Sequence, residues 1–107
     1  MSNRVYMACG NLTIEPTGKI DANYKGWAHD TGPGRGWGGS HRSGAGHGGK
    51  GGYSSSGDAT AGDTYDSLNE PSVPGSGGGG ADGGGGEGGG AVRIEVAGTA
   101  TINGTIT

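Results

Sequence analysis

The run Gly75–Gly90 is the feature that most constrains how this chain can fold. It reads Gly-Ser-Gly-Gly-Gly-Gly-Ala-Asp-Gly-Gly-Gly-Gly-Glu-Gly-Gly-Gly, and one register of every third residue is glycine throughout. An extended helix of the polyproline II type has three residues per turn and no internal hydrogen bonds. In that conformation the unbroken register forms a stripe of bare backbone, which other backbones can approach closely because glycine has no Cβ. The stripe consists of Gly77, Gly80, Gly83, Gly86 and Gly89.

Composition leaves two interpretations of the glycine-rich runs. The 107 residues include 30 Gly and only 4 Pro, without the strict period that collagen requires, so collagen is excluded. A hydrophobic fraction of 28% is too low for a large conventional core. Either the runs are flexible linkers, or they form a polyglycine II bundle held by backbone hydrogen bonds and close van der Waals contact.

Both ends of the chain show the alternation of short, half-buried β-strands. Glycine, proline and asparagine punctuate the two regions, and Asn103-Gly104 suits either a hairpin or the tight corner of a solenoid. The expected inward residues are Val5, Met7, Cys9, Leu12, Ile14 and Ile20 in the first region, and Val92, Ile94, Val96, Ile102 and Ile106 in the second.

The two ends align as copies of one unit. Val5–Cys9 aligns with Val92–Val96, Leu12–Ile14 with Ala100–Ile102, and Gly18–Ile20 with Gly104–Ile106. A unit of this kind cannot bury its apolar face alone, so copies should stack. We expect the last unit to stack on the first unit of another molecule, which allows a filament. The alternative is a module whose neighbours in a longer chain supply the stacking.

We therefore expect one domain over residues 1–107, essentially without α-helix. It combines an N-terminal strand unit (1–23), a polyglycine II insert (24–90) and a C-terminal strand unit (91–107). Within the insert, a glycine-poorer hinge over 58–74 separates two glycine-rich runs, and residues 63–71 are compatible with one helical turn. Pro71 and Pro74 then favour extended chain.

This pattern resembles the glycine-rich modules that interrupt β-solenoid turns in large secreted or surface proteins of bacteria. The resemblance rests on the strand end Gly18–Asn23, the segment Tyr65–Gly80 with its prolines, and the closing stretch Gly88–Ile106. The glycine-rich part is also physically similar to the polyglycine II bundles of springtail antifreeze proteins and certain phage tail-tip adhesins. The resemblance implies a packed bundle and no catalytic role. The chain departs from such modules at His29, His41, His47 and several acidic positions.

Charge and motifs argue against several functional classes. The net charge of −3 is not the footprint of a nucleic-acid-binding protein. No Gly-x-Ser-x-Gly elbow is present, and Gly49-Lys50-Gly51 lacks the hydroxyl residue and following helix of a phosphate loop. Cys9 is the single cysteine, so no internal disulfide forms. We expect no enzyme and no membrane partner. The setting we expect is extracellular or the cell surface, although no signal peptide is visible.

Two kinds of side chain are candidates for binding. The first kind is metal-ligand types, although their spacing matches no known site. Those suited to a transition metal are His29, Asp30, His41 and His47, and those suited to Ca²⁺ are Asp58, Asp63 and Asp66. We therefore expect no metal and no cofactor. Trp27, Trp37 and Tyr53 are candidate surface aromatics, forming either a binding platform or the seal of a bundle edge.

The leading interpretation is a non-catalytic structural protein: a self-assembling extracellular fibre subunit, or a repeat module of a surface protein or adhesin. Its partner is another copy or a neighbouring repeat. The alternative is a flat-faced module that binds ice or a glycan, since Thr99, Thr101, Thr105 and Thr107 could share one outward face.

Overall fold

Short strands from the two ends of the chain pair with one another. The structure, a computed structural model, describes residues 3–54, 60–80 and 84–107, and within them the chain forms six strands and no helix. None of this described part forms a segment suited to crossing a lipid bilayer as a helix. The strands are β1 (Arg4–Cys9), β2 (Leu12–Ile14), β3 (Lys19–Ile20), β4 (Ala91–Val96), β5 (Ala100–Ile102) and β6 (Thr105–Ile106).

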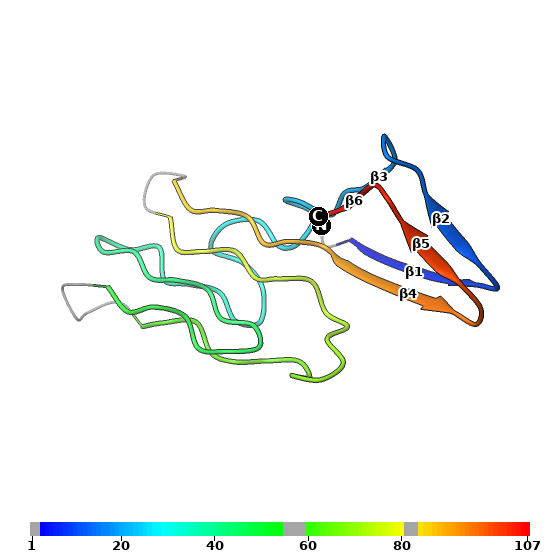
Figure 1. Cartoon of the computed structure of the whole chain (residues 1–107). Helices are drawn as coiled ribbons and strands as arrows, with labels where there is room; N and C mark the ends of the chain where they lie inside the picture. Colours follow the sequence, from blue (N-terminus) through cyan, green and yellow to red (C-terminus); the bar gives the residue numbers. More distant parts are fainter. Residues whose placement is uncertain (1–2, 55–59, 81–83) are drawn as a thin grey trace.

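All three strand pairs are parallel and follow the alignment of the two ends. β1 pairs with β4, β2 with β5 and β3 with β6, so each strand of the first unit lies beside its counterpart in the second (Figure 1). In this register Val5 lies opposite Val92, and Ile14 lies opposite Ile102. We call β1–β3 the first rung and β4–β6 the second rung. The two aligned units therefore stack on one another within one molecule.

The corners between strands are held by asparagine and glycine. Asn11 Oδ1 accepts a hydrogen bond from the Thr99 amide at 2.8 Å, which ties the first corners of the two rungs together. A Cβ on Gly104 would overlap the carbonyl oxygen of Gly18, so only glycine fits there. Asn103-Gly104 thus joins β5 to β6, which pair with different strands. Of the two alternatives for this dipeptide, the hairpin is wrong.

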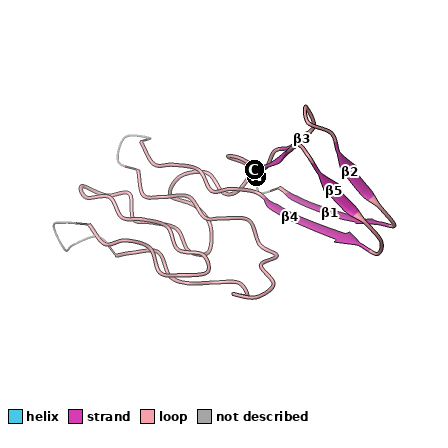
Figure 2. Cartoon of the chain, in the orientation of Figure 1, coloured by secondary structure: helices cyan, strands magenta, loops and turns pink. Residues whose placement is uncertain are grey.

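The glycine-rich part lies beside the rungs as a set of extended segments without regular strands (Figure 2). Its central segment, residues 75–80, donates three consecutive amide hydrogen bonds to three different segments. The pairs are Gly77 with Thr31 (3.0 Å), Gly78 with Gly86 (2.9 Å) and Gly79 with Ser43 (2.9 Å). In a β-strand, successive amides point to only two sides. The amides of these three residues therefore point in three directions.

The last two glycine-rich segments run in opposite directions. Gly75 donates to Gly89 and Gly78 donates to Gly86, so the partner number falls by three as the donor number rises by three. A second group of three segments forms a closed set of backbone bonds: Gly44 to Gly52, Gly51 to Gly62, and Gly62 to Gly44. These bonds give partners to backbone N–H and C=O groups that would otherwise be buried unpaired.

The expected helical turn over 63–71 is wrong. Asp66 has a φ of 66°, which lies in the left-handed region and is incompatible with a right-handed turn. Its carboxylate instead accepts the amides of Ser72 and Val73, both at 2.7 Å. Residues 58 and 59 of the expected hinge lie outside the described residues.

Few apolar side chains are deeply buried in the described residues. Ile14 and Ala61 are buried, as is Pro74, which is the large side chain most completely enclosed. The buried positions are instead mostly glycines, such as Gly77, Gly79 and Gly88. The close approach of backbones therefore does much of what side-chain packing does in an ordinary domain.

Candidate functional site

The apolar residues of the rungs that were expected to face inward are only partly covered. Ile14, in the first rung, is 6% exposed, whereas its register partner Ile102 is 51% exposed. Val5 and Ile106 are 49% and 42% exposed. Met7, Cys9, Leu12, Ile20, Val92, Ile94 and Val96 are intermediate. Two rungs are too few to enclose an interior, so apolar surface is left at the ends of the stack.

Each rung also has a free edge of backbone groups. Every sheet in the described residues has two strands, so each strand is paired on one side. In β4 the amide of Ala91 donates to Asn3 of the first rung at 3.2 Å, and just beyond β4 Ala97 donates to Cys9 at 3.0 Å. Because successive residues alternate, Val92, Ile94 and Val96 direct their backbone groups to the opposite edge.

The same geometry applies to β5. The Leu12 amide donates to the Thr99 carbonyl at 3.0 Å, and Leu12 lies opposite Ala100. In a parallel pair a residue bonds to the two neighbours of its register partner and not to the partner itself. Ala100 therefore directs its amide away from β2, along the stack.

The glycine stripe is not continuous. A Cβ on Gly77 would overlap the Ala28 carbonyl oxygen, and one on Gly80 would overlap the Gly85 nitrogen. Gly86 and Gly89 are exposed, with open space where a Cβ would be, so the expectation that they face the bundle interior is wrong. Gly83 lies outside the described residues. The physical reason is that residues 75–80 and 84–90 are two antiparallel segments, and the buried register on the second one contains Gly85 and Gly88.

The candidate aromatic residues do not form one platform. Trp27 is partly buried and packs against Gly32, where a Cβ would lie 2.8 Å from the indole Cγ. Trp37 and Tyr53 are 51% and 67% exposed, and Tyr53 lies 5.5 Å from the Lys50 ammonium. Arg35 lines the hollow that contains Trp37 as well as the hollow that contains Tyr53.

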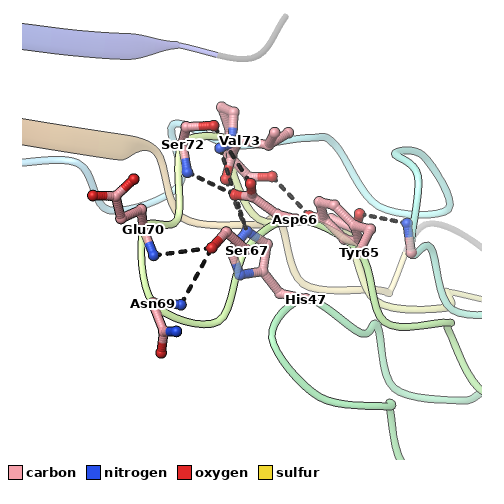
Figure 3. Close-up of polar contacts among 11 residues, drawn as sticks. His47, Tyr65, Asp66, Ser67, Asn69, Glu70, Ser72 and Val73 are labelled. Atoms are coloured by element: carbon pink, nitrogen blue, oxygen red, sulfur yellow. Dashed lines mark hydrogen bonds and ion pairs between the residues drawn. The ribbon is translucent and has the colours of Figure 1, made fainter.

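An Asp66-centred loop anchors the segment that leads into the central glycines (Figure 3). The Asp66 side chain is 7% exposed and binds the two amides described above. These backbone donors, Val73 first, outweigh the effect of desolvation and hold the pKa of the Asp66 carboxyl below its ordinary value. Asp66 is therefore an ionised clamp on its own loop at neutral pH.

His47 and Tyr65 hold the same loop from the other side. His47 Nε2 donates to the Val73 carbonyl at 2.8 Å and lies 3.5 Å from the Asp66 carboxylate. The Tyr65 hydroxyl donates to the Pro74 carbonyl at 2.7 Å, and its ring meets the edge of His47 at 4.7 Å between centroids. His47 is thus a structural residue here.

The expected metal-ligand types are dispersed. Of the described residues, no three His, Cys, Asp or Glu side chains come close enough to hold a metal ion. His29 lies next to Asp30, with 3.2 Å between Nδ1 and Oδ2, and His47 belongs to the Asp66 loop. Asp58 lies outside the described residues. Thr101 and Thr105 of the expected threonine array lie on β5 and β6, which belong to different sheets.

The roles of Asp30 and Asp66 were not foreseen from the sequence. Both have positive φ and accept backbone amides, at Gly80 for Asp30 and at Ser72 and Val73 for Asp66. Aspartate is one of the few non-glycine residues that tolerate this conformation, and its side chain readily bonds nearby amides. Asp58, Asp63 and Asp82 also lie beside glycine in the sequence, so this setting alone does not distinguish Asp30 and Asp66.

Comparisons with protein-family models, with curated proteins and with solved structures find no match to this chain.

Proposed function

We propose that this protein is a non-catalytic assembly module that pairs its second rung with the first rung of another copy. The observation that carries the proposal is that three parallel pairs join corresponding strands of the two rungs, and each strand is bonded on one edge. A sheet edge with unpaired amides and carbonyls is a template for a further strand. The second rung presents such an edge on β4, β5 and β6.

The two outer edges match one another. On β4, the outward backbone groups belong to Val92, Ile94 and Val96. On β1, alternation places those of Arg4 and Tyr6 on the outer edge, because Asn3 and Cys9 face β4. If a second copy stacks with Val5 opposite Val92, the Val92 groups meet those of Arg4 and Tyr6. The register within one molecule can therefore continue into the next.

Partly exposed apolar residues favour the same contact. Ile102 and Ile106 lie on the second rung and Val5 on the first, all at least 42% exposed. Another rung at either end would cover them as β5 covers Ile14. Burial of this apolar area would add to the backbone hydrogen bonds.

At a finer level, we assign the strand part to two turns of a β-solenoid and the glycine-rich part to a polyglycine II bundle inserted between them. The solenoid assignment is supported by rungs that repeat in register. The bundle assignment is supported by the three directions of the Gly77, Gly78 and Gly79 amides. The resemblance to glycine-rich modules of bacterial secreted and surface proteins, including adhesins, supports an extracellular or cell-surface setting.

The test is sedimentation velocity over a wide range of protein concentration. We expect the wild-type protein to associate, and Ala100→Pro to weaken association at least tenfold. Proline removes an amide that points away from β2, and proline is tolerated on an edge strand of this kind. Ala100→Ser, which keeps the amide, is the matched control.

Two results would refute the proposal. The first is a wild-type protein that stays monomeric at every concentration. The second is an Ala100→Pro variant that associates like the wild type while its thermal unfolding is unchanged. If Ala100→Pro unfolds early, Val92→Pro repeats the test at the outer edge of β4.

A further inference from the structure

A hollow beside Trp37 lies in the glycine-rich part and takes no part in the strand pairing. It has a volume of about 350 Å³ and is lined by Asp30, Arg35, Gly36, Trp37, Gly38 and Gly39. We call it the Trp37 hollow. One aromatic ring, one carboxylate and one guanidinium surround it, and the rest of its wall is glycine backbone.

The Trp37 backbone is rigidly held while its ring stays accessible. Its amide donates to Ser43 Oγ at 2.8 Å, and its carbonyl accepts the Ser43 amide at 3.2 Å. Ser43 is 5% exposed, and its hydroxyl donates to the Thr60 carbonyl at 2.6 Å. The Trp37 residue nevertheless remains 51% exposed. The indole ring is therefore accessible to a ligand, while the backbone that carries it is held in place.

The ring lies close to the floor of the hollow because of Gly39. A Cβ on Gly39 would overlap the indole nitrogen of Trp37. Similarly, a Cβ on Gly38 would overlap the Asp30 carboxylate. Glycine at these two positions therefore lets the ring and the carboxylate sit against the backbone, on either side of one open space.

Asp30 is fixed in direction and keeps free acceptor capacity. Its φ of 58° is uncommon for a residue with a side chain, and its Oδ1 accepts the Gly80 amide at 2.9 Å. That amide, and then His29, hold the pKa of the Asp30 carboxyl below its ordinary value, so the group is ionised at neutral pH. A carboxylate has about four lone-pair positions, and the two contacts with Gly80 and His29 leave some of them for a ligand.

We propose that the Trp37 hollow binds a neutral pyranose ring of a saccharide. One face of such a ring carries C–H groups, which suit the flat indole of Trp37. Its hydroxyl groups both donate and accept, so they can donate to Asp30 and accept from Arg35. A hollow of about 350 Å³ is large enough for one sugar residue and open enough for the ring to be part of a chain.

The charges in the hollow discriminate against other ligands of similar size. Asp30 repels a phosphate or carboxylate ligand, and Arg35 repels a quaternary ammonium ligand. Asp30 and Arg35 line the same hollow, so both charges act on a ligand bound there. A neutral ligand that combines hydroxyl donors and acceptors with an apolar face suits all three side chains.

The test is NMR titration of the full chain with methyl glycosides of glucose, mannose, galactose and N-acetylglucosamine. We expect at least one of them, with millimolar affinity, to shift the Trp37 indole signal and the amides of Gly38 and Gly39. Choline and inorganic phosphate serve as probes for the two ligand classes that the charges disfavour.

Single-residue variants distinguish binding in the Trp37 hollow from nonspecific binding elsewhere on the surface. Trp37→Ala should weaken binding at least tenfold with little change in thermal unfolding, and Asp30→Asn should weaken it severalfold. Tyr24→Ala is the matched control, because Tyr24 is 73% exposed and does not line the hollow. It should bind like the wild type.

The proposal is overturned if none of the glycosides shifts these signals at tens of millimolar. It is also overturned if choline or phosphate binds there in preference, or if Trp37→Ala binds as well as the wild type. Should Trp37→Ala fail to fold, Arg35→Ala provides the same comparison from the exposed side of the hollow.

Discussion

At the scale of single residues, the glycine-rich part is specified by where a Cβ cannot fit. Gly88 and Gly89 are neighbours with opposite surroundings. A Cβ on Gly88 would overlap the Gly75 carbonyl oxygen, whereas one on Gly89 would meet nothing within 4 Å. Adjacent glycines therefore contribute to stability in opposite ways, which composition alone cannot reveal.

We expect Gly88→Ala to lower the free energy of unfolding by about 1–3 kcal/mol, the usual cost of overpacking. Gly89→Ala should leave it unchanged or raise it by about 0.4–1 kcal/mol, because alanine restricts the unfolded chain. Urea unfolding of both variants measures the difference. Equal stabilities would show that the two backbones do not approach as described.

Asp66 provides a pH-dependent contribution. Its pKa is lowered in the folded protein, so the carboxylate stabilises the fold fully above its unfolded-state pKa of about 4. This stabilisation is lost as pH falls through the lower, folded-state pKa. Asp66→Asn lacks the charge at every pH.

The difference in unfolding free energy between wild type and Asp66→Asn should therefore be largest at neutral pH and should shrink below about pH 4. Chemical unfolding at several pH values checks this. The other carboxyl groups titrate in both proteins, so their contributions cancel in the difference and the remaining pH dependence belongs to Asp66. A difference that is independent of pH would mean that the charge does not hold the loop.

At the scale of elements, the sequence predicts the strands, but it predicts the arrangement of the glycine-rich segments only in part. Alternation in Val5–Cys9 and Val92–Val96 fixes which side chains face inward, and a shift of one residue would reverse every face. The register of β1 with β4 follows from this. Glycine has no side chain to set a register, so the sequence predicts a three-residue period but not which glycines become buried.

The lack of a side chain on glycine also explains why the expected orientation of Gly86 and Gly89 is wrong. Gly86 and Gly89 share a sequence register with Gly77 and Gly80, but the two pairs lie on segments that run in opposite directions. The site residues that depend on chain reversal, such as Asp30 beside Gly80, have no signal in linear spacing. Their 50-residue separation is bridged only by the fold.

Order in the central segment can be measured directly. We expect the amides of Gly77, Gly78 and Gly79 to exchange with solvent much more slowly than those of an unstructured glycine chain, since each donates to a different neighbour. Residue-resolved hydrogen exchange checks this. Fast exchange at all three would identify the run as a linker.

At the scale of the whole molecule, the insert limits how copies stack. Strands in a sheet lie about 4.8 Å apart, so two rungs rise about 10 Å along the stack. The molecule measures 50 × 26 × 22 Å, so its glycine-rich part extends beyond the rungs in that direction. In the stack that we propose, successive inserts would therefore have to diverge around the stack axis.

The central claim is that the free edge of β4 receives the first rung of another copy. The most direct test is hydrogen exchange at the amides of Val92, Ile94 and Val96 as a function of protein concentration. We predict that these amides exchange quickly in dilute protein and become protected as concentration rises. The amide of Ala97, which donates to Cys9 within the molecule, should be protected throughout. If the three edge amides exchange at the same rapid rate at every concentration, the edge stays open and the account is contradicted.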